Sequence, residues 1–353
     1  MAVAERYGLS RVVLSLMNKA VNTAYQIMGE ALMDVSSAPG DDVRVLSVDG
    51  VRFNCRILWN DDHPQTVPVV YTHDAFARMH FCGLSGPISD VATLVQVNLP
   101  GSGDADDVPV DQSPDFLIRV LLEVMDEVPL PRVNLVGGSA TGPLAYQFAR
   151  RYPERVRRLV LIAAVASASE MRSLHADKSV SWDEGVTETL TQSDIDTVLR
   201  LLVDHSSGNP VIGRDAVRDR LRAMFGHMMP EEIARLAHQW QALAALSTDS
   251  GGGAYDGPAL VCTGEFDALT PPEACREFAA TLAPSTFATI GRADHMAHLE
   301  RIHEVADLVR RFVTDQPLDG LPYLASIEYF LGPRGAETPA TPQAPRPPVV
   351  PGP

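Results

Sequence analysis

The stretch that decides the fold is residues 133–162, VNLVGGSATGPLAYQFARRYPERVRRLVLI. Its apolar runs at 133–136 and 158–163 predict buried strands, and 142–152 between them predicts a helix. The sequence GGSATG joins the first strand directly to the helix. Glycines permit the crowded backbone of such a sharp turn, which projects its central Ser139 into the open at the carboxyl end of the strand. Ser139 is therefore a candidate nucleophile.

A serine hydroxyl is a poor nucleophile without a base, so this interpretation requires a histidine and an acid. The segment CTGEFDALTPPEA, 262–274, places Asp267 in the loop after a predicted strand, and GRADHMAHLERI, 291–302, places His295 after the next. Doubly wound sheets put their sites at the carboxyl ends of strands, so the three side chains are expected to meet. Glu265 is the alternative acid. His298 is the alternative base, although a helix is expected to begin there.

The rest of the chain continues the alternation of strands and helices. Alternation of this kind predicts an α/β fold with a mainly parallel eight-stranded sheet flanked by helices. Asp49-Gly50 predicts a hairpin between the first two strands. The predicted strands are 43–48, 51–58, 67–72, 94–99, 133–136, 158–163, 259–263 and 286–290, and the helices around them 114–127, 142–152, 272–283 and 298–313.

The chain divides into four predicted regions. Residues 1–42 form an N-terminal extension, with an amphipathic helix at 8–34 that could pack on the core, cover a cleft or make a homodimer contact. Residues 43–167 and 251–331 form the α/β core. Residues 168–250 break the alternation with helices near 193–204, 214–226 and 230–246, and are expected to form a lid. The proline-rich residues 332–353 are expected to be a disordered tail.

Composition narrows the partners. The formal charge of −16, from 29 basic and 45 acidic residues, argues against nucleic acid and anionic membranes and leaves a small-molecule substrate. No apolar run reaches the roughly 18 residues of a membrane span, and Asn18 and Lys19 interrupt the N-terminal apolar stretch, so no signal peptide is expected.

The cysteines and the glycine-rich turns carry no sign of a cofactor. Cys55, Cys82, Cys262 and Cys275 form no C-x-x-C pair and fit a reducing cytoplasm. No dinucleotide fingerprint follows the first strand, and no metal ligands cluster. We expect a cytoplasmic protein that needs no cofactor and no metal.

Taken together, the motifs resemble the α/β-hydrolase superfamily over roughly residues 43–313. The resemblance rests on Gly137-x-Ser139-x-Thr141, on Gly264-Glu265-Phe266-Asp267 with Thr270-Pro271, on Asp294-His295, and on the family's oxyanion-loop position at His73-Asp74 and its next turn at residues 99–103. It implies that Ser139 is the nucleophile, His295 the general base and then acid, and Asp267 the residue that orients the imidazole. It also implies an oxyanion hole made by the backbone N–H groups of Ala140 and Ala75.

Two residues depart from the family pattern. Asp74 stands where the family usually has glycine, and its carboxylate would repel an oxyanion unless it is protonated or points away. Thr141 replaces the last glycine of the elbow, and its branched side chain is expected to open the turn slightly or to contact a ligand. His73, Asp74 and Thr141 are therefore candidate substrate-binding residues.

Three functions remain open from the sequence. The first is a serine esterase acting on a small, apolar secondary metabolite. The second is a lyase on the same fold that eliminates an acyloxy group such as acetate, because Asp74 and the N-terminal extension weakly resemble the acetate-eliminating enzymes of tetronate biosynthesis. The third is a ligand-binding member without catalysis.

The predicted lid bears on the substrate. Its apolar side chains favour an apolar, polyketide-like molecule where they face the cleft, whereas its arginines 214, 218, 220 and 222 are expected to form a solvated helix face. The apolar residues are Leu199, Leu201, Leu202, Met224, Phe225, Met228, Met229, Trp240 and Leu243.

Overall fold

The computed structural model describes residues 41–72, 83–109, 112–113, 115–167, 192–203, 208–246, 253–282 and 284–331. The predictions for the N-terminal helix and its dimer contact, the proline-rich tail, Cys82, His73, Asp74 and Ala75 lie outside these residues. Among the described residues, no helix has the length and apolarity needed to cross a membrane.

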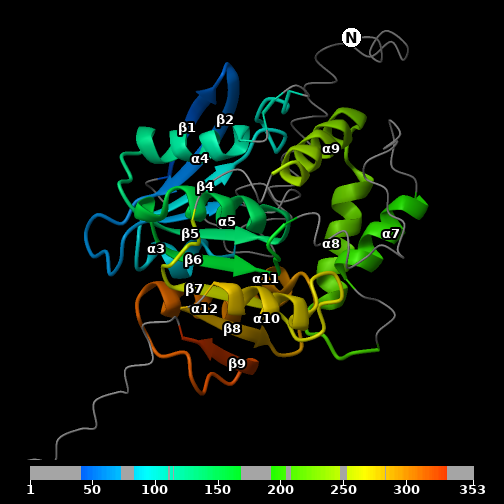
Figure 1. Ribbon diagram of the computed structural model, residues 1–353. Coiled ribbons are helices and arrows are strands. Elements are labelled where there is room, and N and C mark those ends of the chain that lie inside the picture. Colours follow the sequence, from blue (N-terminus) through cyan, green and yellow to red (C-terminus); the bar gives the residue numbers. More distant parts are fainter. Residues whose placement is uncertain are drawn as a thin grey trace, which may run out of the picture.

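The described part of the chain is built on one nine-stranded sheet (Figure 1). The six strands from β3 to β8 run parallel, and β1, β2 and β9 join by antiparallel pairing. The strand order is β1-β2-β4-β3-β5-β6-β7-β8-β9. The strands are β1 Asp41–Val48, β2 Val51–Leu58, β3 Val69–Thr72, β4 Leu94–Asn98, β5 Val133–Gly138, β6 Val156–Ile162, β7 Ala259–Gly264, β8 Ser285–Ile290 and β9 Leu324–Phe330.

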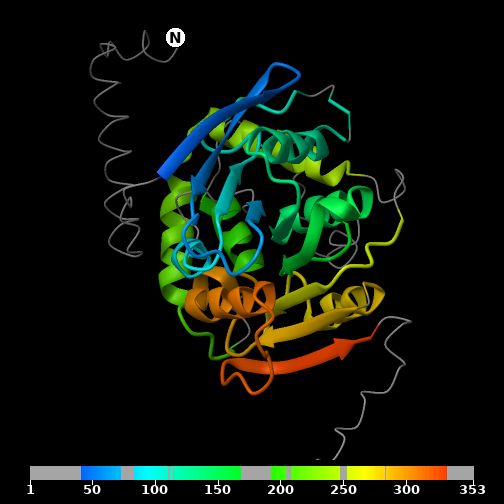
Figure 2. The ribbon, with the colours of Figure 1, turned by 90° about the vertical axis from the view of Figure 1, so that its left-hand side faces the viewer.

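Helices cover both faces of the sheet, as Figures 1 and 2 show. One face packs on α4 (Phe116–Glu127), α5 (Gly142–Arg151) and α10 (Pro272–Thr281), and the other on α3 (Ser85–Ser89) and α12 (Ile302–Val313). The central strands are buried on both faces, which is why their sequences are mostly apolar rather than alternating apolar and polar. The short helix α11 (Ala297–Glu300) precedes α12, with Arg301 between them, so the predicted helix 298–313 is two helices.

The eight predicted strands are all present, and the expected α/β sheet is confirmed with one addition. Strand β9 extends the sheet beyond β8 in a region where the sequence analysis assigned no element. The predicted Asp49-Gly50 hairpin is also confirmed, because both residues have the positive φ values, 52° and 80°, that a two-residue hairpin loop requires.

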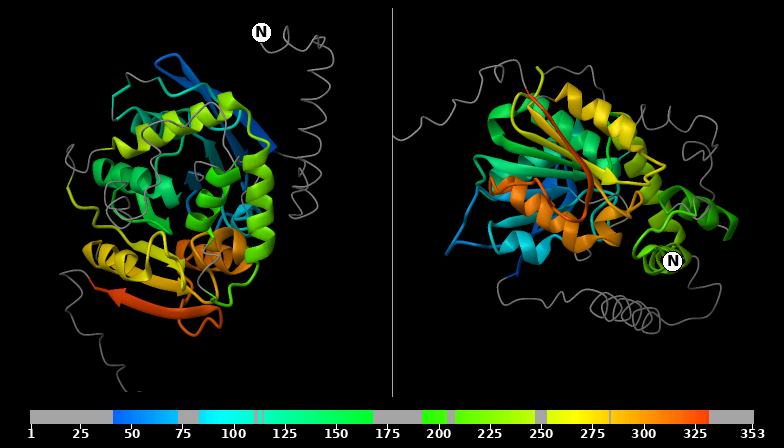
Figure 3. Two further views of the ribbon diagram at one scale, coloured as in Figure 1. Left: turned by 90° about the vertical axis from the view of Figure 1, so that its right-hand side faces the viewer. Right: turned by 90° about the horizontal axis from the view of Figure 1, so that it is seen from below.

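Three helices, α7 (Gln192–Leu202), α8 (Arg214–Gly226) and α9 (Pro230–Ala244), lie between β6 and β7 in the chain, where the sequence predicts the helical insertion. They stand beside the ends of the parallel strands (Figure 3). Helices α7 and α8 form a small apolar core of their own, which includes Met296 and contacts Leu269 and Leu299. Those three residues belong to the loops after β7 and β8, so the insertion packs on the loops that carry the candidate site.

Candidate active site

The candidate nucleophile lies on a strained turn between β5 and α5. Ser139 has a φ of 45°, a conformation that a non-glycine residue adopts at a cost. Gly137 makes the turn possible, because a Cβ there would lie 2.7 Å from the Cβ of Ala145 and 2.9 Å from the carbonyl oxygen of Thr141. The N-terminus of α5 follows the turn, with Pro143 in its first turn, and its dipole favours negative charge near Ser139.

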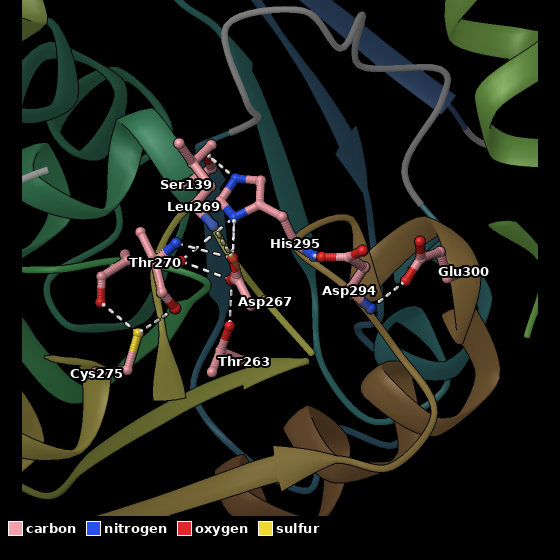
Figure 4. Close-up of polar contacts among 10 residues, drawn as sticks. Ser139, Thr263, Asp267, Leu269, Thr270, Cys275, Asp294, His295 and Glu300 are labelled. Carbon is pink, nitrogen blue, oxygen red and sulfur yellow. Dashed lines mark hydrogen bonds and ion pairs between the residues drawn. The ribbon is translucent and has the colours of Figure 1, made fainter. Parts of the chain in front are cut away.

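The structure brings Ser139, His295 and Asp267 into one hydrogen-bonded chain (Figure 4). Ser139 Oγ lies 2.8 Å from His295 Nε2, and His295 Nδ1 lies 3.0 Å from Asp267 Oδ2. The three residues are 8%, 0% and 3% exposed, so bulk water does not separate them. In the tautomer that fits both contacts, the hydroxyl of Ser139 donates to Nε2 and Nδ1–H donates to the carboxylate.

Both oxygens of the Asp267 carboxylate accept hydrogen bonds from neighbouring residues. Its Oδ1 accepts hydrogen bonds from the backbone N–H groups of Leu269 and Thr270 at 2.9 and 2.8 Å. Its Oδ2 accepts from the hydroxyl of Thr270 at 2.7 Å and from that of Thr263. Burial raises the pKa of Asp267, but the charge of His295 and these hydrogen bonds outweigh it and leave the pKa below its ordinary value. Asp267 is therefore ionised where it faces His295.

Neither alternative from the sequence takes part in this chain. Glu265 is exposed, and its carboxylate accepts a hydrogen bond from the backbone N–H of Arg292. His298 lies within α11, as expected for a position where a helix begins, and it is His295 that contacts Ser139.

The histidine loop, residues 291–300, is held by two further carboxylates. Asp294 Oδ1 accepts from the backbone N–H of His295 at 2.9 Å, and Glu300 Oε2 accepts from the backbone N–H of Asp294 at 2.6 Å (Figure 4). Burial raises the pKa of Glu300 to about 7, and the neighbouring charge of Asp294 adds to the shift. Both carboxylates thus fix the backbone that carries the imidazole.

The helical insertion reaches this loop through Arg214. The guanidinium of Arg214, the first residue of α8, lies 3.2 Å from Asp294 Oδ2, and the two side chains are only 13% and 1% exposed. The backbone N–H of Ile212 also donates to the carbonyl of Arg292. The expected solvated arginine face is wrong for Arg214, although Arg218 does pair with the exposed Asp215 and Asp219. Helical periodicity does not indicate that the side chain of Arg214 contacts a loop eighty residues further along the chain.

On its other side the insertion packs on the turn after β4. Gln239 of α9 is fully buried, and its amide donates to the carbonyl of Pro100 at 2.7 Å and to the hydroxyl of Ser102 at 2.6 Å. Gly101 has a φ of +88°, and a Cβ there would lie 2.8 Å from the Cβ of Gln239. The family-type turn at residues 99–103 therefore serves as a seat for α9.

Thr141 does not open the elbow as expected. It is fully buried, and its hydroxyl contacts Thr72 and Gly138. The close crossing that the motif's glycine usually permits falls instead on Gly142, where a Cβ would lie 2.3 Å from the Cβ of Ala164. The proposed contact between Thr141 and a ligand is not supported, because the side chain has no exposed surface.

Of the two predicted oxyanion donors, Ala140 lies in the turn next to Ser139 and is 4% exposed. Ala75, like the candidate substrate residues His73 and Asp74, falls outside the described residues. A search of the described residues finds no group of three or more His, Cys, Asp or Glu side chains that could hold a metal ion.

Comparisons with known proteins agree with this architecture. A family model described as the alpha/beta hydrolase fold matches residues 74–302. The chain is 28% identical to a 2-hydroxy-6-oxo-2,4-heptadienoate hydrolase of Pseudomonas putida, over 55% of this chain and 67% of that protein. It is 26% identical to the biotin biosynthesis bifunctional protein of Teredinibacter turnerae, over 65% of this chain and only 40% of that protein's length.

Among solved structures, an alpha/beta hydrolase from a Medee basin deep-sea metagenome superposes with a TM-score of 0.64. The match covers 78% of this chain and 99% of that one at 16% identity. At this identity the likeness shows the fold alone. With the family model matching well over half of its length, the chain belongs to the alpha/beta hydrolase family.

Proposed function

We propose that the protein is a serine hydrolase that cleaves an acyl ester of a small, apolar molecule. The observation that carries the proposal is the buried chain from Ser139 Oγ through His295 to Asp267, with contacts of 2.8 and 3.0 Å. In this proposal Ser139 is the nucleophile, His295 the base and Asp267 the orienting acid, and each lies within hydrogen-bond reach of the next. The family membership and the hydrolases among its relatives support the same class of reaction.

The first half of the reaction acylates the enzyme. Ser139 Oγ attacks the carbonyl carbon of the ester while His295 Nε2 takes the hydroxyl proton. The carbonyl π electrons move to its oxygen, and in this proposal the backbone N–H of Ala140 stabilises that oxyanion together with the α5 dipole. His295 then gives its proton to the leaving oxygen, the carbon–oxygen bond breaks, and an alcohol departs. Asp267 stabilises the imidazolium that exists between the two proton transfers.

The second half returns the enzyme to its starting state. A water molecule gives one proton to His295 Nε2 and attacks the acyl carbon. Collapse of the tetrahedral intermediate breaks the bond to Ser139 Oγ, which recovers its proton from His295. The acid leaves and no external reductant, oxidant or metal enters the balance.

The proposed substrate class follows from the helical insertion. Its apolar core packs directly on Met296, Leu299 and Leu269, so the insertion covers the site loops with apolar side chains. Arg214 of the insertion faces the site loops, but it is already paired with Asp294. These contacts favour an apolar acyl compound under an insertion that acts as a lid.

Hydrolysis of a carbon–carbon bond is the second candidate, favoured by the Pseudomonas putida relative. The molecule in that relative's name, 2-hydroxy-6-oxo-2,4-heptadienoate, contains no ester, so its hydrolysis must break a bond to carbon beside the keto group. The elimination predicted as an alternative depends on Asp74 and the N-terminal extension, which lie outside the described residues.

The experiment compares wild type with Ser139→Ala on a short-chain p-nitrophenyl ester. We expect kcat to fall by about 10³-fold or more, because removing a triad member leaves only oxyanion stabilisation and binding. Normal turnover in the Ser139→Ala variant would remove Ser139 from the reaction. Product analysis on an acylated metabolite separates the chemistries, since hydrolysis gives an alcohol and elimination an alkene. An oxo-dienoate substrate tests carbon–carbon cleavage.

A further inference from the structure

The hydroxyl of Thr141 is the centre of a small buried network at the base of the elbow. Its Oγ1 lies 2.8 Å from the carbonyl oxygen of Thr72 and 2.9 Å from that of Gly138. It also accepts from the backbone N–H of Gly138 at 3.2 Å and lies 3.1 Å from the hydroxyl oxygen of Thr72, which is also 3.2 Å from the carbonyl oxygen of Val136 as an alternative acceptor for its proton. One donated proton and two accepted bonds use the full capacity of a hydroxyl group.

The network ties together two strands that end at the site. Thr72 is the last residue of β3, and it pairs in register with Gly137 of β5. Gly138 immediately precedes the strained Ser139, whose φ is 45°. A strained residue keeps its conformation only where its surroundings over-determine it, and the Thr141 hydroxyl supplies such a restraint on both sides of the turn.

We propose that Thr141 is a positioning residue whose hydroxyl clamps the elbow to the end of β3 and so fixes Ser139 Oγ and the Ala140 N–H in catalytic geometry. This inference rests on the proposed function. Thr141 and Thr72 are both fully buried, so the clamp acts through the backbone and not by contact with substrate. The glycine that the elbow motif has at this position lacks a hydroxyl and could not make it.

If the hydroxyl forms the clamp, a variant that keeps the volume of Thr141 but loses its hydroxyl should have a lower kcat than a variant that keeps the hydroxyl. Thr141→Val keeps the shape but removes the hydroxyl, and its kcat should fall about 10-fold to 100-fold with KM nearly unchanged. Thr141→Ser keeps the hydroxyl and should retain most of kcat. Thr289→Val is the matched control, because Thr289 is also a buried strand threonine with a bonded hydroxyl, on β8.

A short alkyl trifluoromethyl ketone gives a readout that simple loss of stability would not move. Ser139 Oγ adds to its carbonyl, the proton goes to His295, and the resulting alkoxide occupies the oxyanion site. The concentration of active sites in each variant is first measured by titration with a fluorophosphonate, and kcat is calculated per active site. The affinity for the ketone should then fall in Thr141→Val by the same factor as kcat. Unchanged kcat and inhibitor affinity in Thr141→Val would overturn the clamp, as would equal losses in the Ser and Val variants.

Two further outcomes keep the test decisive. If Thr141→Val does not fold, Thr141→Ala removes the same hydroxyl without added bulk and is compared with Thr141→Ser; equal kcat in the Ala and Ser variants would then contradict the proposal. If Ser139→Ala retains ester hydrolysis, the proposed function itself fails. If Thr141→Val has wild-type kcat and Ser139→Ala is inactive, the clamp is contradicted but the proposed function is not.

Discussion

The two loops that complete the site are held in different ways. The acid loop after β7 is fixed from within the sheet core, because Thr263, Thr270 and the backbone N–H of Leu269 all donate to Asp267. The histidine loop after β8 is held within the core by Glu300 and by the backbone N–H of Phe266. It is held in addition from outside the sheet by Arg214 of the insertion, through Asp294. The position of the acid therefore depends on the α/β core, and that of the base depends also on the helical insertion.

The buried carboxylates of the two loops show the same contrast. Asp267 and Glu300 are both removed from water, which raises the pKa of each. Hydrogen bonds and the charge of His295 reverse the effect at Asp267, whose pKa lies below its ordinary value. Glu300 has the hydrogen bond from the backbone N–H of Asp294 but faces the like charge of the Asp294 carboxylate, and its pKa is about 7. Burial alone does not set the charge of a carboxylate; the hydrogen-bond donors and the charges around it also contribute.

The largest expected effect is at the acid loop. Asp267→Asn preserves the size of the side chain but removes the charge that holds the Nδ1–H tautomer of His295. We expect kcat to fall by about 10⁴-fold, as for other triads that lose this charge. The measurement is ester hydrolysis at pH 7.

Glu265→Gln is the control for Asp267→Asn, since Glu265 lies two residues away on the surface. A comparable loss in Glu265→Gln, or normal activity in Asp267→Asn, would show that the acid has been assigned to the wrong carboxylate.

The next effect tests the dependence of the histidine loop on the insertion. Arg214→Ala leaves the Asp294 carboxylate buried without this ion pair, which should lower the free energy of unfolding by about 3 kcal/mol. Because Asp294 accepts from the backbone N–H of His295, kcat should fall about 10-fold as well.

Arg218 on the same helix pairs only with exposed carboxylates. The control variant Arg218→Ala should therefore change the free energy of unfolding by less than about 1 kcal/mol. Thermal unfolding and kcat are measured for both arginine variants. Equal behaviour of the two would mean that the insertion does not support the histidine loop.

The smallest effect concerns Glu300 and pH. A carboxyl whose pKa is raised on folding binds its proton more tightly in the folded chain, so its contribution to stability is lost as pH rises from about 4.5 to about 7. Glu300→Gln keeps an acceptor for the Asp294 N–H but cannot ionise. It should gain at most about 3 kcal/mol relative to wild type between pH 4.5 and pH 8.

Unfolding midpoints in denaturant across this pH range measure the Glu300 effect. A constant difference between wild type and Glu300→Gln would mean that Glu300 titrates as an ordinary carboxyl.

Much of the fold was predictable because the central strands can be recognised from their sequences. These parallel strands are short, fully buried and rich in apolar residues, and each loop that carries a site residue follows one. Strand β9 was not predicted because it lies at the sheet edge, where its residues are exposed or only partly buried; Glu328 forms an ion pair with Arg276 and Tyr329 is 46% exposed. Its sequence, LASIEYF, lacks the apolar run of a central strand.

The meeting of Ser139, Asp267 and His295 was also predictable, since all three follow parallel strands whose carboxyl ends share one edge. The supports of these residues were not. Thr141 resembled a defect in the elbow motif, and only the register of β3 against β5 places Thr72 beside it. Arg214 belonged to a basic helix, and nothing local in the sequence shows that it contacts Asp294.

The central claim is that Ser139 is a nucleophile activated by His295. It is tested most directly by treating the protein with a serine-directed fluorophosphonate and mapping the adduct by peptide mass spectrometry. We expect one adduct, on Ser139, that is absent in Ser139→Ala and forms far more slowly in His295→Ala. Labelling of folded Ser139→Ala at the wild-type rate, or no adduct on folded wild-type protein, would contradict it.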